Sequence, residues 1–216
     1  MTSWPGTASG RGEGPARVLA MAAITAMIGL MAWLVRTPVG SERIEWRAIA
    51  PPLETPMHPW RWIVIHHSGM PGGDTASIDS VHVRDRGWDG IGYHFVIGNG
   101  RPMPRGRVDA TWRWKQQYHG AHAGPGPQQS PYNQDGIGIC VIGNYDDAEL
   151  DPYVERRLVE LCALLIAHSP ALSPAHIIGH RDVPGNETDC PGKHMDIARI
   201  RFLVREELMR TESGKR

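Results

Sequence analysis

Two histidines and one cysteine of this chain are spaced as they would be in a metal site. Short apolar runs end in histidine at two places, at His66 with His67 and at His180, and Cys190 follows in a loop rich in proline and glycine. Two imidazoles and a thiolate are a good zinc donor set, and three protein ligands leave the fourth position of a tetrahedral ion for a water molecule. The pattern therefore predicts an open, catalytic type of zinc site.

Each of these residues also has a plainer interpretation. A single buried histidine is usually a hydrogen-bonded part of the core, and a single buried cysteine usually packs as a small hydrophobic residue. Successive side chains of a strand point to opposite faces, so His66 and His67 cannot both reach one metal ion from a regular strand. A site of the predicted kind uses one of the two.

Short β-branched and apolar runs predict four strands, and the histidines stand at the ends of two of them. The expected strands are 62–66, 93–97, 137–142 and 176–179. Strands separated by helices indicate an α/β fold, with a central mixed β-sheet flanked by helices. Ligands of open α/β sheets gather outside the carboxyl ends of the strands, so we expect the zinc groove at those ends.

Three helices are expected around these strands. Residues 77–88 are weakly helical, a second helix begins with Asp151 as N-cap and Pro152 at its first position, and a third begins after Asp196. Residues 98–100 read Gly-Asn-Gly and follow the second expected strand. This is a hairpin turn signal, because Asn-Gly accommodates positive φ.

The chain divides by composition into five segments. They are 1–17, a short polar N-terminus; 18–36, a transmembrane signal anchor; 37–59, a Pro-rich linker; 60–210, the folded domain; and 211–216, a polar tail. The anchor is expected because residues 18–35 carry no charge and would span about 27 Å as a helix. A cleaved signal peptide and a buried helix are the alternatives, although no small-residue cleavage site follows the run.

Charge and cysteine content exclude several classes of protein. Lys+Arg and Asp+Glu both number 23, so the formal net charge is zero. This balance does not fit a dedicated nucleic-acid binder or a highly charged disordered chain, and we expect a monomer without a nucleic-acid partner. Three cysteines are too few for a disulfide framework. Cys140 and Cys162 are expected to be buried thiols, and their pairing stays open.

Six short blocks occur in order between residues 60 and 208. They are VIHHS at 64–68, RGWDGIGYHFVI at 86–97, GAHA at 120–123, GIGICVIGNY at 136–145, GHRD at 179–182 and TDCPG at 188–192. Together they resemble the zinc-dependent N-acetylmuramoyl-L-alanine amidases. That family includes amidase-type phage lysozymes and peptidoglycan recognition proteins.

The resemblance implies a role for each matched residue. The zinc ligands would be His66, His180 and Cys190. Tyr93 matches the tyrosine beside the zinc site of active members, and Thr188 matches a position that contacts the developing oxyanion. The groove positions expected to bind substrate are His122, Asn133 and Trp88. The family fold is a central mixed sheet packed by helices, with a groove over the zinc ion.

The chain departs from the family pattern in two respects. Cys140 stands where relatives that recycle anhydro-muropeptides carry glutamate, which favours the branch that uses a tyrosine. The ten-residue spacing from His180 to Cys190 resembles the recycling branch instead. The middle of 101–135 does not align well. Its candidates for a glycan-binding groove are Trp112, Trp114, Tyr118 and His119.

The resemblance implies Zn²⁺-dependent hydrolysis of the amide bond between N-acetylmuramic acid and L-alanine in peptidoglycan. The alternatives are a non-catalytic peptidoglycan-recognition module and, more remotely, another metal hydrolase or a structural envelope protein. Cys190, Tyr93 and Thr188 together favour catalysis, because non-catalytic relatives commonly replace the third ligand. With the anchor, the expected location is the bacterial inner (cytoplasmic) membrane, single-pass, with the domain facing the periplasm and cell wall. The stem-peptide type stays open.

Overall fold

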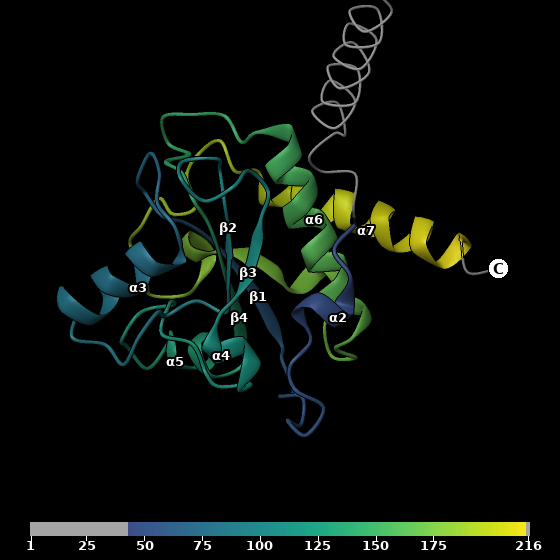
Figure 1. Cartoon of the computed structure of the whole chain (residues 1–216), viewed down its shortest axis with the longest axis horizontal. Helices are drawn as coiled ribbons and strands as arrows, with labels where there is room; N and C mark the ends of the chain where they lie inside the picture. The colour runs from purple at the N-terminus through teal and green to yellow at the C-terminus, as the bar shows by residue number, and fades with distance from the viewer. Residues whose placement is uncertain (1–42, 215–216) are drawn as a thin grey trace, which may run out of the picture. The chain divides into compact units, whose positions relative to one another are not determined.

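Five short strands form one mixed sheet at the centre of the described part of the molecule. The structure is a computed structural model and describes residues 43–214. The strands are β1 (Trp62–His67), β2 (Phe95–Ile97), β3 (Val108–Ala110), β4 (Gly136–Val141) and β5 (Ile177–Gly179). Their order is β3-β2-β4-β1-β5, with β3 antiparallel to β2 and the other neighbours parallel (Figure 1). The predicted α/β class with a central mixed sheet is confirmed.

Strand β3 is the strand that the sequence did not predict. It lies at the sheet edge, all three of its residues are half-buried, and its middle residue is Asp109. Such a strand has no apolar run to mark it. The turn signal at 98–100 does precede it, and β2 and β3 form an antiparallel hairpin whose connection runs over residues 98–107.

Helices cover both faces of the sheet (Figure 1). On one face lie α6 (Pro152–Ala167) and α7 (Ile197–Ser213), and on the other lie α3 (Thr75–Arg84) and α5 (Ser130–Gln134). The remaining helical segments are α2 (Trp46–Ile49), α4 (Trp112–Lys115) and the 3-10 turns η1 (Pro174–His176) and η2 (His180–Asp182).

The two faces of the sheet bury different side chains. On β1, Ile63 and Ile65 belong to the main hydrophobic core, which the buried residues of α6 and α7 complete. Val64 belongs to a smaller cluster with Ala123 on the opposite face. Because side chains alternate along a strand, His66 lies on the face of Val64 and not on the face packed by α6 and α7. This alternation separates His66 from its neighbour His67.

The expected caps of the two long helices are present. The carboxylate of Asp151 accepts hydrogen bonds from the first turn of α6, and that of Asp196 accepts one from the first turn of α7. Helix α3 begins earlier than the expected 77–88 and ends four residues sooner. A capping box between Asp74 and Ser77 sets that start, a signal that the prediction overlooked.

The segment expected to be an extended linker, 37–59, is partly packed against the domain. Within its described part, Ile49 is 3% exposed and its carbonyl oxygen accepts from Nε1 of Trp114 at 2.6 Å. The ring of Trp46 stacks on His168 with centroids 3.8 Å apart. Two tryptophan contacts therefore hold the described part of 37–59 against the domain, although its prolines suggested an extended linker.

The two ends of the chain differ in what the structure describes. Helix α7 continues through Ser213, so the polar tail expected from residue 211 is helical in its described part. The expected membrane anchor, 18–36, lies outside the described residues. Within 43–214, none of the helices combines the length and apolar character needed to cross a bilayer.

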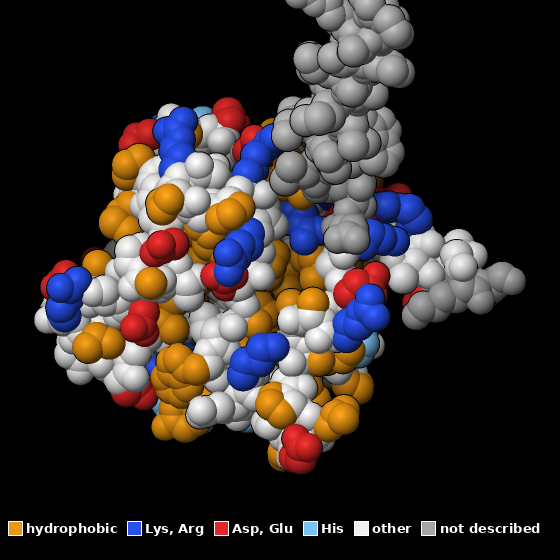
Figure 2. Space-filling view, in the orientation of Figure 1, with side chains coloured by type: hydrophobic (Ala, Val, Ile, Leu, Met, Phe, Trp, Pro, Cys, Tyr) orange, Lys and Arg blue, Asp and Glu red, His pale blue; other side chains and the backbone are white. Residues whose placement is uncertain are grey.

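One face of the described domain shows how the charges are distributed. In Figure 2 the Lys and Arg side chains are interspersed with Asp and Glu and with apolar atoms. The described residues of this face therefore offer no continuous basic surface of the kind that nucleic acids require.

Candidate active site

The register of the parallel strands brings the two predicted histidine ligands together. Strands β1 and β5 are neighbours, and Ile65 pairs with Gly179. His66 and His180 each follow one member of that pair, so they lie at the same level of the sheet although 114 residues separate them. Cys190 completes the group, and one donor atom from each of the three residues lies within 4.8 Å of the others.

The three donors fit a zinc ion in spacing and in chemistry. Nδ1 of His66 lies 3.8 Å from Sγ of Cys190. Bonds of about 2.1 Å to nitrogen and 2.3 Å to sulfur place two ligands of a tetrahedral zinc ion about 3.6 Å apart. Nε2 of His180 is buried and has no hydrogen-bond partner among the described residues, which a bound ion would supply.

Burial sets the protonation of the donors. It lowers the pKa of His66 well below the usual value, and the neighbouring His122 and His180 lower it further. Burial also lowers the pKa of His180. Both imidazoles are therefore neutral, which is the form that binds metal. Burial raises the pKa of the Cys190 thiol to about 11, so without a cation the thiol keeps its proton. Metal binding would release it.

Arg181 holds the loop that carries Cys190. Its guanidinium donates to the carbonyl oxygens of Asp189 at 3.1 Å, Gly192 at 2.8 Å and Met195 at 3.1 Å. Its backbone N–H donates to the carbonyl oxygen of Cys190 at 2.8 Å. One residue next to His180 therefore joins the second donor of the cluster to the third. The sequence reasoning missed this role, although Arg181 lies inside one of the six blocks.

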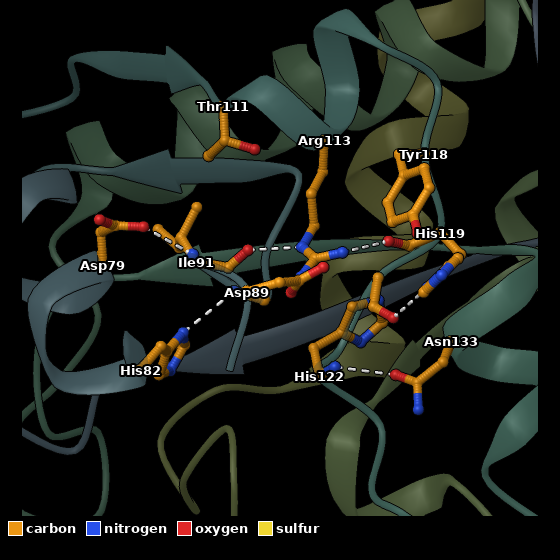
Figure 3. A network of polar contacts seen from close by, with 12 residues as sticks. Asp79, His82, Asp89, Ile91, Thr111, Arg113, Tyr118, His119, His122 and Asn133 are labelled. Atoms are coloured by element: carbon orange, nitrogen blue, oxygen red, sulfur yellow. Dashed lines mark hydrogen bonds and ion pairs between the residues drawn. The ribbon is translucent and has the colours of Figure 1, made fainter. Parts of the chain in front are cut away.

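Tyr93 lies beside His66, and a polar network holds the loop before it. The two ring centroids are 5.0 Å apart. Buried Arg113 donates through Nε to the carbonyl oxygen of Ile91 at 2.5 Å, and its guanidinium also contacts Asp89 (Figure 3). The hydroxyl of Thr111 donates to the carbonyl oxygen of Tyr93 at 2.7 Å.

The same network closes on helix α3. The carboxylate of Asp79 accepts from the N–H of Ile91 at 2.7 Å, and Nδ1 of His82 accepts from the N–H of Gly92 at 3.0 Å (Figure 3). Arg113 lies in the segment that did not align, so sequence reasoning missed it. The signal available was a lone arginine between Trp112 and Trp114, which is a weak one.

The Tyr93 hydroxyl is a protonated phenol in a buried setting. Burial raises its pKa well above the usual value, and the nearby thiols of Cys140 and Cys190 raise it further. Cys140 and Cys162 are both free and buried, as expected. Tyr93 thus has a proton to donate beside the three donors.

Thr188 lies next to the third donor. Its Oγ1 accepts a hydrogen bond from the backbone N–H of Cys190 at 3.2 Å. The hydroxyl is half-buried and keeps its own proton for another acceptor. The structure therefore places the two candidates for polar contact with a reacting group, Tyr93 and Thr188, around the donor cluster.

A cavity of about 540 Å³ opens beside the donors. Its wall includes His180, and the three residues expected to bind substrate, His122, Asn133 and Trp88, all line it. Arg86 lines it too, with its guanidinium 5.1 Å from the centroid of the Trp88 ring. A pocket of this size with one cation and several aromatic rings suits an amphipathic, anionic ligand.

Asn133 and the aromatic candidates are used in different ways. The Asn133 amide accepts from the N–H groups of His122 and Ala123 and donates to the carbonyl oxygen of Gly124, each at 2.8 Å. It therefore shapes the cavity wall through the backbone, and contact with substrate stays a prediction. Among the aromatic candidates, His119 lines the cavity, whereas Trp114 is fully buried and cannot bind a glycan.

The other histidines of the blocks have structural partners. Nδ1 of His67 accepts from the N–H of Tyr145 at 3.2 Å, away from the donor cluster. Nδ1 of His94 accepts from the N–H of Gly138 at 3.0 Å, and its Nε2 donates to the carbonyl oxygen of Tyr118 at 2.9 Å. These contacts give both residues structural roles.

The fold and the donors define a class of protein: a mixed-sheet α/β domain with a His-His-Cys cluster at the carboxyl ends of its strands, beside an open cavity. Residues 56–193 match a family model described as N-acetylmuramoyl-L-alanine amidase. That match covers more than half of the chain. The chain belongs to this family.

Individual relatives agree with the family match. An N-acetylmuramoyl-L-alanine amidase of Sus scrofa is 32% identical over 162 residues, which are 68% of this chain and 23% of the pig protein. Peptidoglycan-recognition protein SC1a of Drosophila melanogaster is 30% identical over 62% of this chain and 69% of its own length. The chain therefore spans about a quarter of the first relative and two thirds of the second.

Solved structures share the fold. The N-acetylmuramoyl-L-alanine amidase LysC from Clostridium intestinale superimposes with a TM-score of 0.56 at 27% identity, covering 70% of this chain and 91% of that one. Drosophila PGRP-LB superimposes with a TM-score of 0.51 at 27% identity, covering 68% and 82%. Both named amidases and named recognition proteins are thus among the structural relatives.

Proposed function

We propose that this chain is a zinc-dependent amidase that hydrolyses the bond between N-acetylmuramic acid and L-alanine in peptidoglycan. The observation that carries the proposal is the cluster of His66, His180 and Cys190, whose donor atoms lie within 4.8 Å of one another beside the Tyr93 ring. A module that only binds peptidoglycan has no need of three intact donors and a buried phenol at one point of its groove.

The residues have distinct tasks in this proposal. His66, His180 and Cys190 would hold a zinc ion, which supplies polarisation of the scissile carbonyl and acidification of a water molecule. The neutral phenol of Tyr93 donates a hydrogen bond to the oxygen on which negative charge develops, and Thr188 is a second donor from the opposite loop. Tyr93 would also donate its phenol proton toward the departing L-alanine amine and recover one from the attacking water, so that the phenol ends as it began.

The cavity beside the donors is the proposed binding site for the muropeptide. One chain of a solved complex between tracheal cytotoxin and peptidoglycan recognition proteins LCa and LCx aligns with this chain at 26% identity and a TM-score of 0.51. That named ligand supports a peptidoglycan-derived occupant for the same groove here. Trp88 and His122 on the cavity wall are the proposed contacts.

Digestion of purified peptidoglycan by the full chain tests the proposal. Mass spectrometry should find free glycans together with peptides that begin with intact L-alanine, and a chelator should abolish their release. Tyr93→Phe should keep zinc but lower kcat by about 100-fold, as expected for loss of one oxyanion donor. Cys190→Ser should lose both zinc and activity. Binding of peptidoglycan without any cleavage would instead identify a recognition module.

We also propose that residues 18–36 anchor the chain in the bacterial inner membrane with the domain on the side of the cell wall. The support is the uncharged run at 18–35. Alkaline extraction of membranes from cells that express the full chain should leave it in the membrane fraction. Recovery of a shorter, soluble form would show cleavage instead.

A further inference from the structure

His122 is a buried histidine that touches a proposed zinc ligand without belonging to the donor cluster. Its Nδ1 lies 3.1 Å from Nε2 of His66, and its Nε2 lies 3.1 Å from the carbonyl oxygen of Gly136. We infer that His122 is a positioning residue that fixes the tautomer and orientation of His66, so that Nδ1 of His66 is the atom that binds the metal. The inference rests on the proposed zinc-dependent function.

The carbonyl of Gly136 determines which nitrogens of His122 and His66 carry protons. A carbonyl oxygen only accepts, so Nε2 of His122 carries a proton and donates it. His122 is 5% exposed, and within the described residues no carboxylate contacts it, so its imidazole is neutral and has one N–H. Its Nδ1 therefore accepts, and Nε2 of His66 must be the donor.

The tautomer of His66 follows directly. With the proton on Nε2, the free lone pair of the neutral ring is on Nδ1. That atom is the one that lies 3.8 Å from Sγ of Cys190. The lone pair thus faces the other donors. The opposite edge of the ring is hydrogen-bonded to His122, which is in turn hydrogen-bonded to Gly136 of β4. Metal-binding histidines commonly donate their second N–H to an acceptor, usually a carboxylate, a carbonyl or water, which orients the ring and raises its basicity. Here the acceptor is the imidazole of His122.

The backbone is shaped to hold the His122 ring in this place. A Cβ at Gly138 would lie 2.4 Å from Cδ2 of His122, and a Cβ at Gly120 would also lie 2.4 Å from that atom. Two glycines therefore leave the space that the ring occupies. The N–H of His122 donates to Oδ1 of Asn133 at 2.8 Å (Figure 3). A residue that only contacted substrate would not need both restraints.

Zinc affinity separates this role from substrate contact, because it can be measured without substrate. His122→Leu removes the acceptor, whereas His122→Asn places an amide oxygen near the position of Nδ1. We expect competition with a chelator to show about 10- to 100-fold weaker zinc binding for the leucine variant, the usual loss for such a partner. The asparagine variant should recover most of that loss. His119→Ala, on the same cavity wall, is the control and should bind zinc like the wild type.

A second measurement uses the unchanged protein. Nitrogen-15 NMR of the zinc-loaded full chain should show His66 protonated at Nε2 and metal-bound at Nδ1. Gly138→Ala, which displaces the His122 ring, should weaken zinc binding even if the leucine variant does not fold. Wild-type zinc affinity in His122→Leu, or zinc on Nε2 of His66, overturns the inference alone. Absence of zinc binding or of amidase activity in the wild type would overturn the proposed function itself.

Discussion

The site has a half that the sheet positions and a half that loops position. His66 and His180 take their places from the register of β1 and β5, which backbone hydrogen bonds set. Cys190 and Tyr93 lie outside the strands, and the loops that carry them are held by side chains. Arg181 holds the first of these loops, and the network around Arg113 holds the second.

The difference shows two ways of placing a reactive side chain. A pair of strands positions its residues through repeated backbone hydrogen bonds. One side-chain substitution therefore leaves the position of the neighbouring residues almost unchanged. A loop tied by one guanidinium depends on that group, because each carbonyl it satisfies would otherwise be left unpaired at a cost of about 1–3 kcal/mol. The loop-positioned half should therefore be sensitive to residues that never touch substrate.

The largest effect is expected within the sheet-positioned half, at the two adjacent histidines of β1. His66→Ala should weaken zinc binding and lower kcat/KM by more than about 100-fold, more than the loss of an outer partner. His67→Asn keeps an acceptor for the N–H of Tyr145 and should stay within about threefold of wild type. Chelator competition and muropeptide hydrolysis measure both. Equal losses in the two variants would contradict the assignment of His66 and His67 to opposite faces.

The next effect tests the loop of Cys190. Arg181→Met leaves three carbonyl oxygens without the guanidinium, so the loop should loosen and zinc affinity should fall about tenfold, with unfolding free energy lower by about 1–3 kcal/mol. Urea titration and chelator competition measure the two quantities. Arg199→Met, which removes only the exposed ion pair with Glu155, is the matched control and should change neither.

A smaller and different effect is expected for the loop of Tyr93. Arg113→Met should lower kcat about fivefold while zinc affinity stays at the wild-type value, because this arginine binds the carbonyl oxygen of Ile91 in the loop before Tyr93 and contacts none of the three donors. Steady-state kinetics on a soluble muropeptide and chelator competition distinguish the two outcomes. A loss of zinc with Arg113→Met would show that the two loops are not independent.

The last prediction concerns stability and not zinc binding or catalysis: the loop-positioned half should depend on pH. Burial lowers the pKa of His82 to about 4, and its neutral Nδ1 accepts from Gly92. Between pH 6.5 and 4 the unfolded chain binds a proton that the folded chain does not, so the unfolding free energy falls as pH falls. The slope is at most about 1.4 kcal/mol per pH unit.

A variant without the titrating ring isolates this contribution. His82→Asn keeps an acceptor for Gly92 but cannot take up the proton, so urea titrations of the metal-free chain at pH 7, 5 and 4 should show a shallower decline. Parallel curves for the variant and the wild type would show that His82 does not contribute to acid sensitivity.

Most of the fold and the donor cluster could be predicted, and the omissions have common causes. Four of five strands and the capped starts of α6 and α7 are marked by apolar runs and by Asp151 and Asp196. Strand β3 is too short and polar to be marked. Arg113 and Arg181 bind backbone carbonyls of distant segments, and the identity of those segments depends on how the loops fold.

The sequence by itself determined which chemistry is available: two histidines that end strands, a cysteine in a tight loop and a tyrosine in a matched block. Periodicity and spacing carry such information because they reflect local geometry. The family resemblance had already named His66 rather than His67, and the strand geometry agrees with it. Only the tertiary structure decided that His122 lies behind His66 and that two arginines hold the loops. Those choices depend on strand register and on contacts between residues far apart in the chain, which no local pattern encodes.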